Sequence, residues 1–212
     1  RERLDLLCEK LSERRKQAAS GLAEKIRRSL LDLNFLDVEF EISFRKLDKY
    51  TAHGFDEVEF LISTNPGESV KPLGMVASGG ELSRIMLAIK TVLADTDDVP
   101  TLIFDEIDTG ISGRTAQKVS EKLAVISGSR QVICITHLPQ IAAMADYHFE
   151  MAKEPKEAKT VTTIRRLDGR QQIVELARLL GGAEITDAVL QNAGEMKKLA
   201  EQTKRQLREY GA

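Results

Sequence analysis

"PTLIFDE", residues Pro100 to Glu106, is the stretch of sequence that decides the fold. A short, continuous apolar run that ends in two acids is typical of a strand buried on both faces of a parallel sheet. "QVICIT", residues 131–136, is a second run of this kind, and residues 112–127 between them have helical spacing. Strand, helix and strand in this order predict a βαβ unit with parallel strands and a right-handed crossover.

The polar residues that follow these two strands are the first candidates for a functional site. Ligands of parallel α/β sheets gather where the strands end. One carboxylate there can hold Mg²⁺ through its waters, a second can orient or deprotonate water, and an imidazole can hydrogen-bond a phosphate. A solvated loop, a helix cap and a structural histidine are the alternatives for the separate residues. The four candidates are Asp105, Glu106, Asp108 and His137.

"VASGGELSR", residues Val76 to Arg84, opens an apolar run with helical spacing over residues 81–94. Ser78 and Glu81 fit a capping box, in which the serine caps the helix and the glutamate reaches back. That interpretation leaves Gly79 and Gly80 unexplained, because glycine costs backbone entropy. Two glycines expose bare backbone amides at the positive end of a helix, which suits a phosphate.

Taken in order, these pieces resemble the ATP-binding-cassette (ABC) ATPases. "SGGE" is similar to their signature motif, "TLIFDE" to Walker B with its catalytic glutamate, "DTG" to the D-loop and "TH" to the switch histidine. Longer stretches, among them "IFDEIDTGISGRTAQKV" and "LARLLGG", resemble the SMC-like ATPases of bacterial DNA double-strand-break repair. The resemblance covers most of residues 70–182. It implies an α/β fold: an ABC-type head lobe with a mainly parallel sheet, helices on its faces, an N-terminal antiparallel β-hairpin and the end of a coiled-coil arm.

The resemblance also implies a role for each motif residue. Asp105 would help to hold Mg²⁺, Glu106 would polarise the hydrolytic water, and His137 would contact the γ-phosphate of ATP. Asp108 would help to link two sites across a dimer of heads. The signature residues would bind ATP held by the opposite protomer; they are Ser78, Gly79, Gly80 and Glu81.

One motif of the family is missing from this sequence. A Walker A loop needs a glycine followed by lysine, and none of the 14 glycines here is followed by lysine. We therefore expect the phosphate cradle on an N-terminal lobe outside this sequence, and two ATP molecules sandwiched between the heads of a homodimer. Alone, this chain is expected to bind ATP very weakly and to hydrolyse none.

The N-terminal third is organised differently. Apolar residues three and four apart predict a long helix over residues 1–33, either the end of a coiled-coil arm or a helix lying on the domain. We place the head lobe at residues 34–212. Alternating residues predict two strands, from Val38 to Phe44 and from Val58 to Ile62, joined by a hairpin loop through Gly54. Residues 63–74 are expected to be loop, and later strands at 147–152 and 160–167 precede helices at 171–180 and 184–209.

Composition indicates the cellular compartment and argues against a membrane helix, but it does not indicate a binding partner. The 212 residues carry a net charge of −2, and the two cysteines have no metal-ligand spacing, which favours a reducing cytoplasm. No run is apolar enough to predict a membrane helix. DNA contact and association with the nucleoid follow from the resemblance alone. Basic residues of the first helix could face DNA phosphates or form a solvated coiled-coil surface; they are Arg14, Arg15, Lys16, Lys25, Arg27 and Arg28.

Two other functions fit parts of the pattern. A nucleotide-binding subunit of an ABC transporter normally carries Walker A and the signature on one continuous domain. The region before Ser78 is instead predicted to be a long charged helix and two strands, which disfavours a transporter subunit. A non-catalytic, SMC-like clamp that bridges DNA is the second alternative. Glu106 and His137 are both present, which argues against an inactive ATPase site.

Overall fold

The structure is a computed structural model that describes all residues except 77, 95, 157–158, 183 and 211–212. Side chains are additionally left undescribed at 154–156, 159–160 and 210. The chain divides into two compact units, Arg1–Asp98 and Val99–Ala212, and each is treated by itself. The boundary predicted at residue 33 between an arm and a head lobe stays a prediction.

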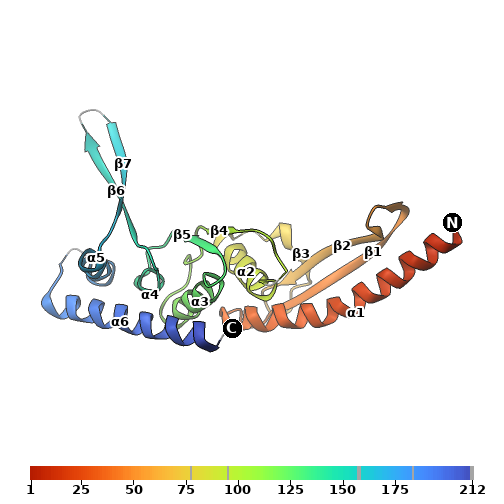
Figure 1. Cartoon of the computed structure of the whole chain (residues 1–212), viewed down its shortest axis with the longest axis horizontal. Coiled ribbons are helices and arrows are strands. Elements are labelled where there is room, and N and C mark those ends of the chain that lie inside the picture. The colour runs from red at the N-terminus through yellow and green to blue at the C-terminus, as the bar shows by residue number, and fades with distance from the viewer. Residues whose placement is uncertain (77, 95, 157–158, 183, 211–212) are drawn as a thin grey trace. The chain divides into compact units, whose positions relative to one another are not determined.

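The first unit is built on a long helix that lies along a β-hairpin (Figure 1). Helix α1 spans Glu2–Asp32, and the antiparallel strands β1 and β2 span Glu39–Thr51 and Gly54–Ser63. Phe40 lies opposite Ile62 and Phe44 opposite Val58, so the alternating residues share one face, as the sequence predicts. That face meets α1, where Ile26 and other apolar side chains are buried.

The loops of this unit are shorter than expected. Residues 47–55, predicted as a hairpin loop, mostly continue the two strands, and the turn is at residues 52–53. Gly54 has a φ of +94°, a conformation that favours glycine. Residues 63–74, predicted as loop, contain the short strand β3 (Lys71–Pro72), which pairs with β2, and the start of the 3₁₀ helix η1 (Leu73–Met75). Strand β3 forms by backbone pairing with the edge of β2, and no apolar pattern in the sequence predicts it.

The buried face of α1 differs from the predicted stripe in its first half. Small side chains at Cys8, Ser12 and Ala19 are buried. Their small size lets the hairpin approach the helix closely, and the hairpin then covers them. The leucines predicted for the stripe in this half are exposed instead: Leu4, Leu7 and Leu11. From Ile26 to Leu33 the predicted stripe is confirmed. Helix α2, Gly79–Val92, packs against α1 and begins two residues earlier than predicted.

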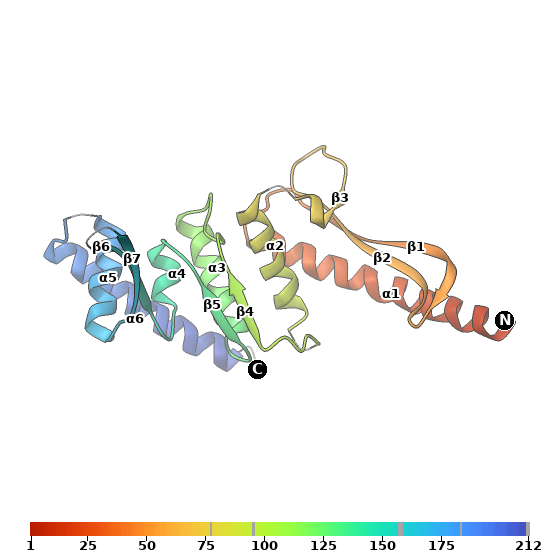
Figure 2. The same ribbon diagram turned by 90° about the horizontal axis from the view of Figure 1, so that it is seen from above.

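The second unit contains the predicted βαβ element (Figure 2). Strands β4 (Thr101–Phe104) and β5 (Gln131–Cys134) are parallel, with Phe104 opposite Cys134, and helix α3 (Gly113–Ile126) joins them. The expectation that both faces of the strands are buried is wrong in this chain. Leu102 and Phe104 are buried on one face, while Ile103 is 67% and Ile133 45% exposed on the other. The other described strand pairs are antiparallel.

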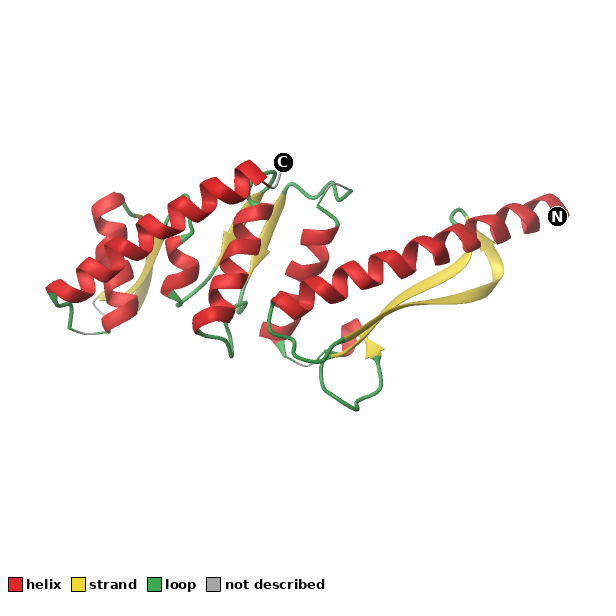
Figure 3. Ribbon diagram, turned by 90° about the horizontal axis from the view of Figure 1, so that it is seen from below, coloured by secondary structure: helices red, strands yellow, loops and turns green. Residues whose placement is uncertain are grey.

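The rest of this unit is a helical layer with a hairpin (Figure 3). The antiparallel strands β6 (Phe149–Lys156) and β7 (Lys159–Arg166) confirm the predicted pair, and α5 (Gly169–Gly181) and α6 (Asp187–Tyr210) confirm the predicted helices. Helix α6 contacts α3, α5 and a short helix that the sequence analysis missed, α4 (Pro139–Ala143). Small buried side chains such as Ala193 allow this close packing. Among the described residues, no helix is long and apolar enough to span a membrane.

Candidate functional site

An acidic turn follows β4, as the sequence predicts. Asp105 and Glu106 are both exposed, and Oδ1 of Asp105 accepts a hydrogen bond of 2.8 Å from the backbone amide of Glu106. Glu106 has a φ of +55°, in the left-handed region that residues other than glycine seldom occupy. A strained backbone of this kind tends to occur at functional positions. Asn34, with a φ of +69°, is the other described non-glycine residue in this region, and Glu106 is the one that lies at the end of β4.

Asp108 and His137 come together, although they follow different strands. The Asp108 carboxylate is buried, and its Oδ2 accepts hydrogen bonds from Oγ1 of Thr136 at 2.6 Å and from the backbone amide of His137 at 2.8 Å. Nδ1 of His137 lies 3.0 Å from the same oxygen, while 71% of the His137 side chain is exposed. The geometry therefore joins the turn after β4 to the turn after β5, as expected for the ends of neighbouring parallel strands.

The Cys134 thiol reports on the electrostatics of this edge. Burial, with the nearby charges of Asp108 and Asp105, raises the pKa of Cys134 to about 12. The thiol therefore stays protonated near neutral pH and is a poor nucleophile or metal ligand there. The carboxyl groups of Asp105 and Asp108 both lie near this thiol, where β4 and β5 end.

The signature residues lie in the first unit, at the start of α2. Ser78 is the N-cap, and its hydroxyl accepts a long hydrogen bond of 3.4 Å from the amide of Glu81, which confirms the serine half of the predicted capping box. The second half, from the Glu81 side chain to Ser78, is absent from the contacts of the described residues. Ser78 and Gly79 are exposed and Gly80 is buried. The exposed start of α2 leaves backbone amides accessible, as an anion site requires.

Sequence analysis missed two residues that organise these motifs. Thr136 bonds Asp108 and accepts a hydrogen bond of 3.0 Å from the amide of Leu138, so it shapes the turn that carries His137. Arg84, at the end of the quoted signature stretch, is buried and lies 5.6 Å from the centre of the Phe35 ring. Burial lowers the pKa of the Arg84 guanidinium, and Glu81 opposes that shift. A charged residue inside an apolar helical run was the available signal for Arg84.

The fit of Mg²⁺ to these residues is partial. Within the described part of the chain, no group of three or more histidine, cysteine, aspartate or glutamate side chains is arranged to hold a metal ion. Mg²⁺ commonly keeps several waters and binds through one or two carboxylates together with substrate phosphates. The exposed Asp105 at the end of β4 fits such a shared site, and it does not fit a cage built from protein alone.

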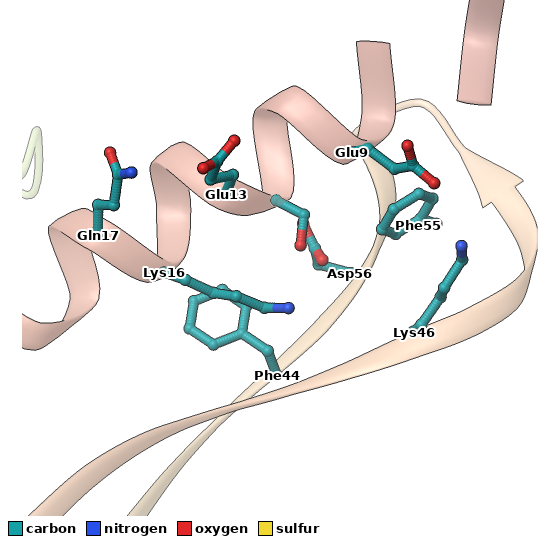
Figure 4. Close-up of a pocket in the computed structure, with 9 residues that line it drawn as sticks. Glu9, Glu13, Lys16, Gln17, Phe44, Lys46, Phe55 and Asp56 are labelled. Atoms are coloured by element: carbon teal, nitrogen blue, oxygen red, sulfur yellow. The ribbon is translucent and has the colours of Figure 1, made fainter. Parts of the chain in front are cut away.

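A cavity of about 530 Å³ lies elsewhere, between α1 and the β1–β2 hairpin (Figure 4). Its wall carries acidic and basic side chains around Phe44 and Phe55 but none of the motif residues. Lys46 lies 4.4 Å from the centre of the Phe55 ring, and Arg15 bonds Asp56 at 3.0 Å. Arg27 similarly donates to the carbonyl of Val38 at 3.2 Å. Part of the basic group on the first helix therefore serves packing within this unit.

The known proteins similar to this chain include DNA repair proteins of several bacteria. No family model matches the chain. DNA repair protein RecN of Halalkalibacterium halodurans is 45% identical over 204 residues, which cover 93% of this chain and 36% of that protein. RecN of Bacillus subtilis is 44% identical over 209 residues, which cover 92% and 36%. The chain is similar to one part of each of these RecN proteins. It spans little more than a third of the length of the RecN proteins it matches.

A solved structure supports the fold independently of RecN. The head domain of an Smc protein from Pyrococcus yayanosii, solved with a coiled coil and joint, matches this chain with a TM-score of 0.54. The match covers 76% of this chain and 29% of that protein at 20% identity. At this identity the likeness concerns the fold alone, which is similar to that of an Smc head domain.

Proposed function

We propose that this chain is part of the ATPase head of a RecN-type protein that acts in the repair of DNA double-strand breaks. The observation that carries the proposal is the contact between the turns that follow β4 and β5. Asp108, two residues after the strained Glu106, is buried and contacts His137. The similarity to RecN at 44–45% identity supports the biological role. It also favours this role over a transporter subunit.

In the proposed reaction, the chain's residues prepare water to attack the γ-phosphate of ATP. Glu106 lies exposed after β4, where its carboxylate orients the water and accepts its proton. The exposed imidazole of His137 contacts the γ-phosphate. Asp105 would hold Mg²⁺, which when bound would neutralise charge on the phosphates. Cys134 takes no part, because its thiol stays protonated.

The signature and the D-loop support a site at a dimer interface. Ser78, Gly79 and Gly80 bind the γ-phosphate of ATP held by a second molecule, and Glu81 completes the signature at the start of α2, where Ser78 and Gly79 are exposed. The exposed D-loop residues Thr109 and Gly110 face that second head. An N-terminal lobe of the same protein supplies Walker A, and two ATP molecules are sandwiched in the homodimer. Bound DNA and a cytoplasmic, nucleoid-associated location belong to the same proposal.

Head dimerisation tests this function directly. In the full-length protein, Glu106→Gln removes the base but keeps the shape of the side chain, so ATP should bind without turnover. We expect the variant to accumulate dimers in ATP and to remain monomeric in ADP during sedimentation. The wild-type protein should form dimers only transiently. An unchanged sedimentation coefficient for Glu106→Gln in ATP contradicts the proposed function.

A further inference from the structure

The contacts of Asp108 lie inside its own chain. Its Oδ2 accepts from Oγ1 of Thr136 at 2.6 Å and from the amide of His137 at 2.8 Å, and it lies 3.0 Å from Nδ1 of His137. The Asp108 side chain is 5% exposed. A buried carboxylate oxygen with three local donors is poorly placed to reach across a dimer interface.

We propose that Asp108 is a positioning residue for His137 of the same chain, fixing both the orientation of the imidazole and the nitrogen that carries its hydrogen. This inference rests on the proposed function and gives Asp108 a role different from the link across the dimer that its motif implies. Asp108 acts through His137 and touches no reacting atom.

The chemistry follows from the two ring nitrogens. A carboxylate accepts hydrogen bonds, so Nδ1 must carry a hydrogen when it faces Oδ2 of Asp108. Nε2 is then the nitrogen left for the exposed side of the ring, where the γ-phosphate is proposed to bind. Neutral, Nε2 accepts a hydrogen bond or a proton; protonated, it donates to a phosphate oxygen while Asp108 stabilises the imidazolium. A carboxylate orients the histidine of serine protease triads in the same physical way.

The surroundings of Asp108 make the orientation rigid. Thr136 is itself held by the amide of Leu138 at 3.0 Å. The turn that contains Asp108 is closed by a hydrogen bond of 3.0 Å from the amide of Thr109 to the carbonyl of Glu106. Asp108 therefore ties the turn that carries Glu106 to the turn that carries His137, and a shift of one turn is transmitted to the other.

Nitrogen NMR of this chain labelled with ¹⁵N-histidine tests the proposal without ATP. The chain has three histidines, and the exposed His53 on the hairpin turn is an internal reference for a ring in solvent. A His137→Gln variant assigns the signals. For neutral rings, we expect His137 to carry the hydrogen on Nδ1, whereas His53 shows the Nε2–H form that free histidine prefers. A His137 ring with the same tautomer mixture as His53 overturns the proposal, and this readout needs no variant of Asp108.

Substitution then tests the mechanism in the full-length protein. Asp108→Asn should shift the His137 tautomer toward that of His53 and lower kcat about 100-fold with little change in KM, because a misplaced group loses rate more than binding. Combined with His137→Gln, it should cause no further loss. If Asp108→Asn abolishes ATP-dependent dimers while the tautomer stays unchanged, the role lies across the dimer and the inference is wrong. If the wild-type protein hydrolyses no ATP, the proposed function fails, whereas the tautomer result still decides whether Asp108 orients His137.

Discussion

The backbone amide of Glu106 donates a hydrogen bond of 2.8 Å to Oδ1 of Asp105, the residue before it in the sequence. This local bond accompanies the left-handed backbone of Glu106, whose φ is +55°. A side chain with a Cβ pays about 1–2 kcal/mol in this region. The rest of the turn must therefore hold Glu106 in place, and the chain tolerates the strain at the position proposed to orient water.

Replacing Glu106 separates stability from activity. Glu106→Gly should raise the free energy of unfolding by about 0.5–1 kcal/mol relative to Glu106→Gln, because glycine adopts positive φ without strain. Both variants should lose ATP hydrolysis in the full-length protein. Urea unfolding followed by circular dichroism measures the difference. Asn34→Gly is the matched control: its φ is +69°, and asparagine already tolerates this region, so the gain should be smaller. Equal stability of the two Glu106 variants would show that the turn is not strained.

Ser78 has two proposed roles that substitution can separate. Ser78→Asp keeps an oxygen that can cap α2 and should leave stability unchanged, but its negative charge should repel the γ-phosphate and prevent ATP-dependent dimers. Ser78→Ala should cost about 0.5–1 kcal/mol, at the low end for a lost cap because the hydrogen bond is long. Dimerisation is measured by sedimentation in the full-length Glu106→Gln background.

Asp168 provides the control for Ser78. It is the N-cap of α5 and forms a complete capping box with Gln171, with bonds of 2.9 and 3.0 Å. Asp168→Ala should cost at least as much stability as Ser78→Ala but leave the ATP-dependent dimer intact. A dimer that survives Ser78→Asp, or is lost in Asp168→Ala, argues against a phosphate contact at Ser78.

Asp56 gives the first unit a dependence on acid pH. Burial opposes its ionisation, but hydrogen bonds from Ser12 and Arg15 prevail and lower the pKa of the Asp56 carboxyl. A lowered folded-state pKa contributes stability above the unfolded value near 3.9, and that stability is lost as pH falls through the folded value. Asp56→Asn should therefore cost about 1–2 kcal/mol at pH 7 and much less near pH 2. Urea unfolding at both pH values measures this, and Asp48→Asn, which is exposed on the neighbouring strand β1, should show neither effect.

The βαβ unit and its polar edge could be predicted from sequence because their signals are local. Two apolar runs predicted β4 and β5, and the residues after them were expected to meet where parallel strands end. The open face of β4 could not be predicted, because the pattern of Leu102 and Ile103 says only that both are apolar.

Contacts between distant residues explain the other differences. The polar half of the hairpin is strand because Tyr50 bonds Asp5 on α1 and Lys46 lies over Phe55. Likewise, spacing placed Asp108 at the edge of the sheet but could not show that Thr136 and His137 are its donors. These contacts join residues that are far apart in the sequence, so the spacing of residues along the chain could not predict them.

Reconstitution of ATP hydrolysis is the most direct test of the central claim, that this chain supplies part of an ATPase head. The chain is coexpressed with the Walker A lobe of the same RecN-type protein, and phosphate release is measured with and without double-stranded DNA. We predict turnover by the pair, stimulated by DNA and abolished by Glu106→Gln, and none by either part alone. Turnover by this chain alone that Glu106→Gln abolishes, or a stable complex of the two lobes that hydrolyses no ATP, would contradict the account.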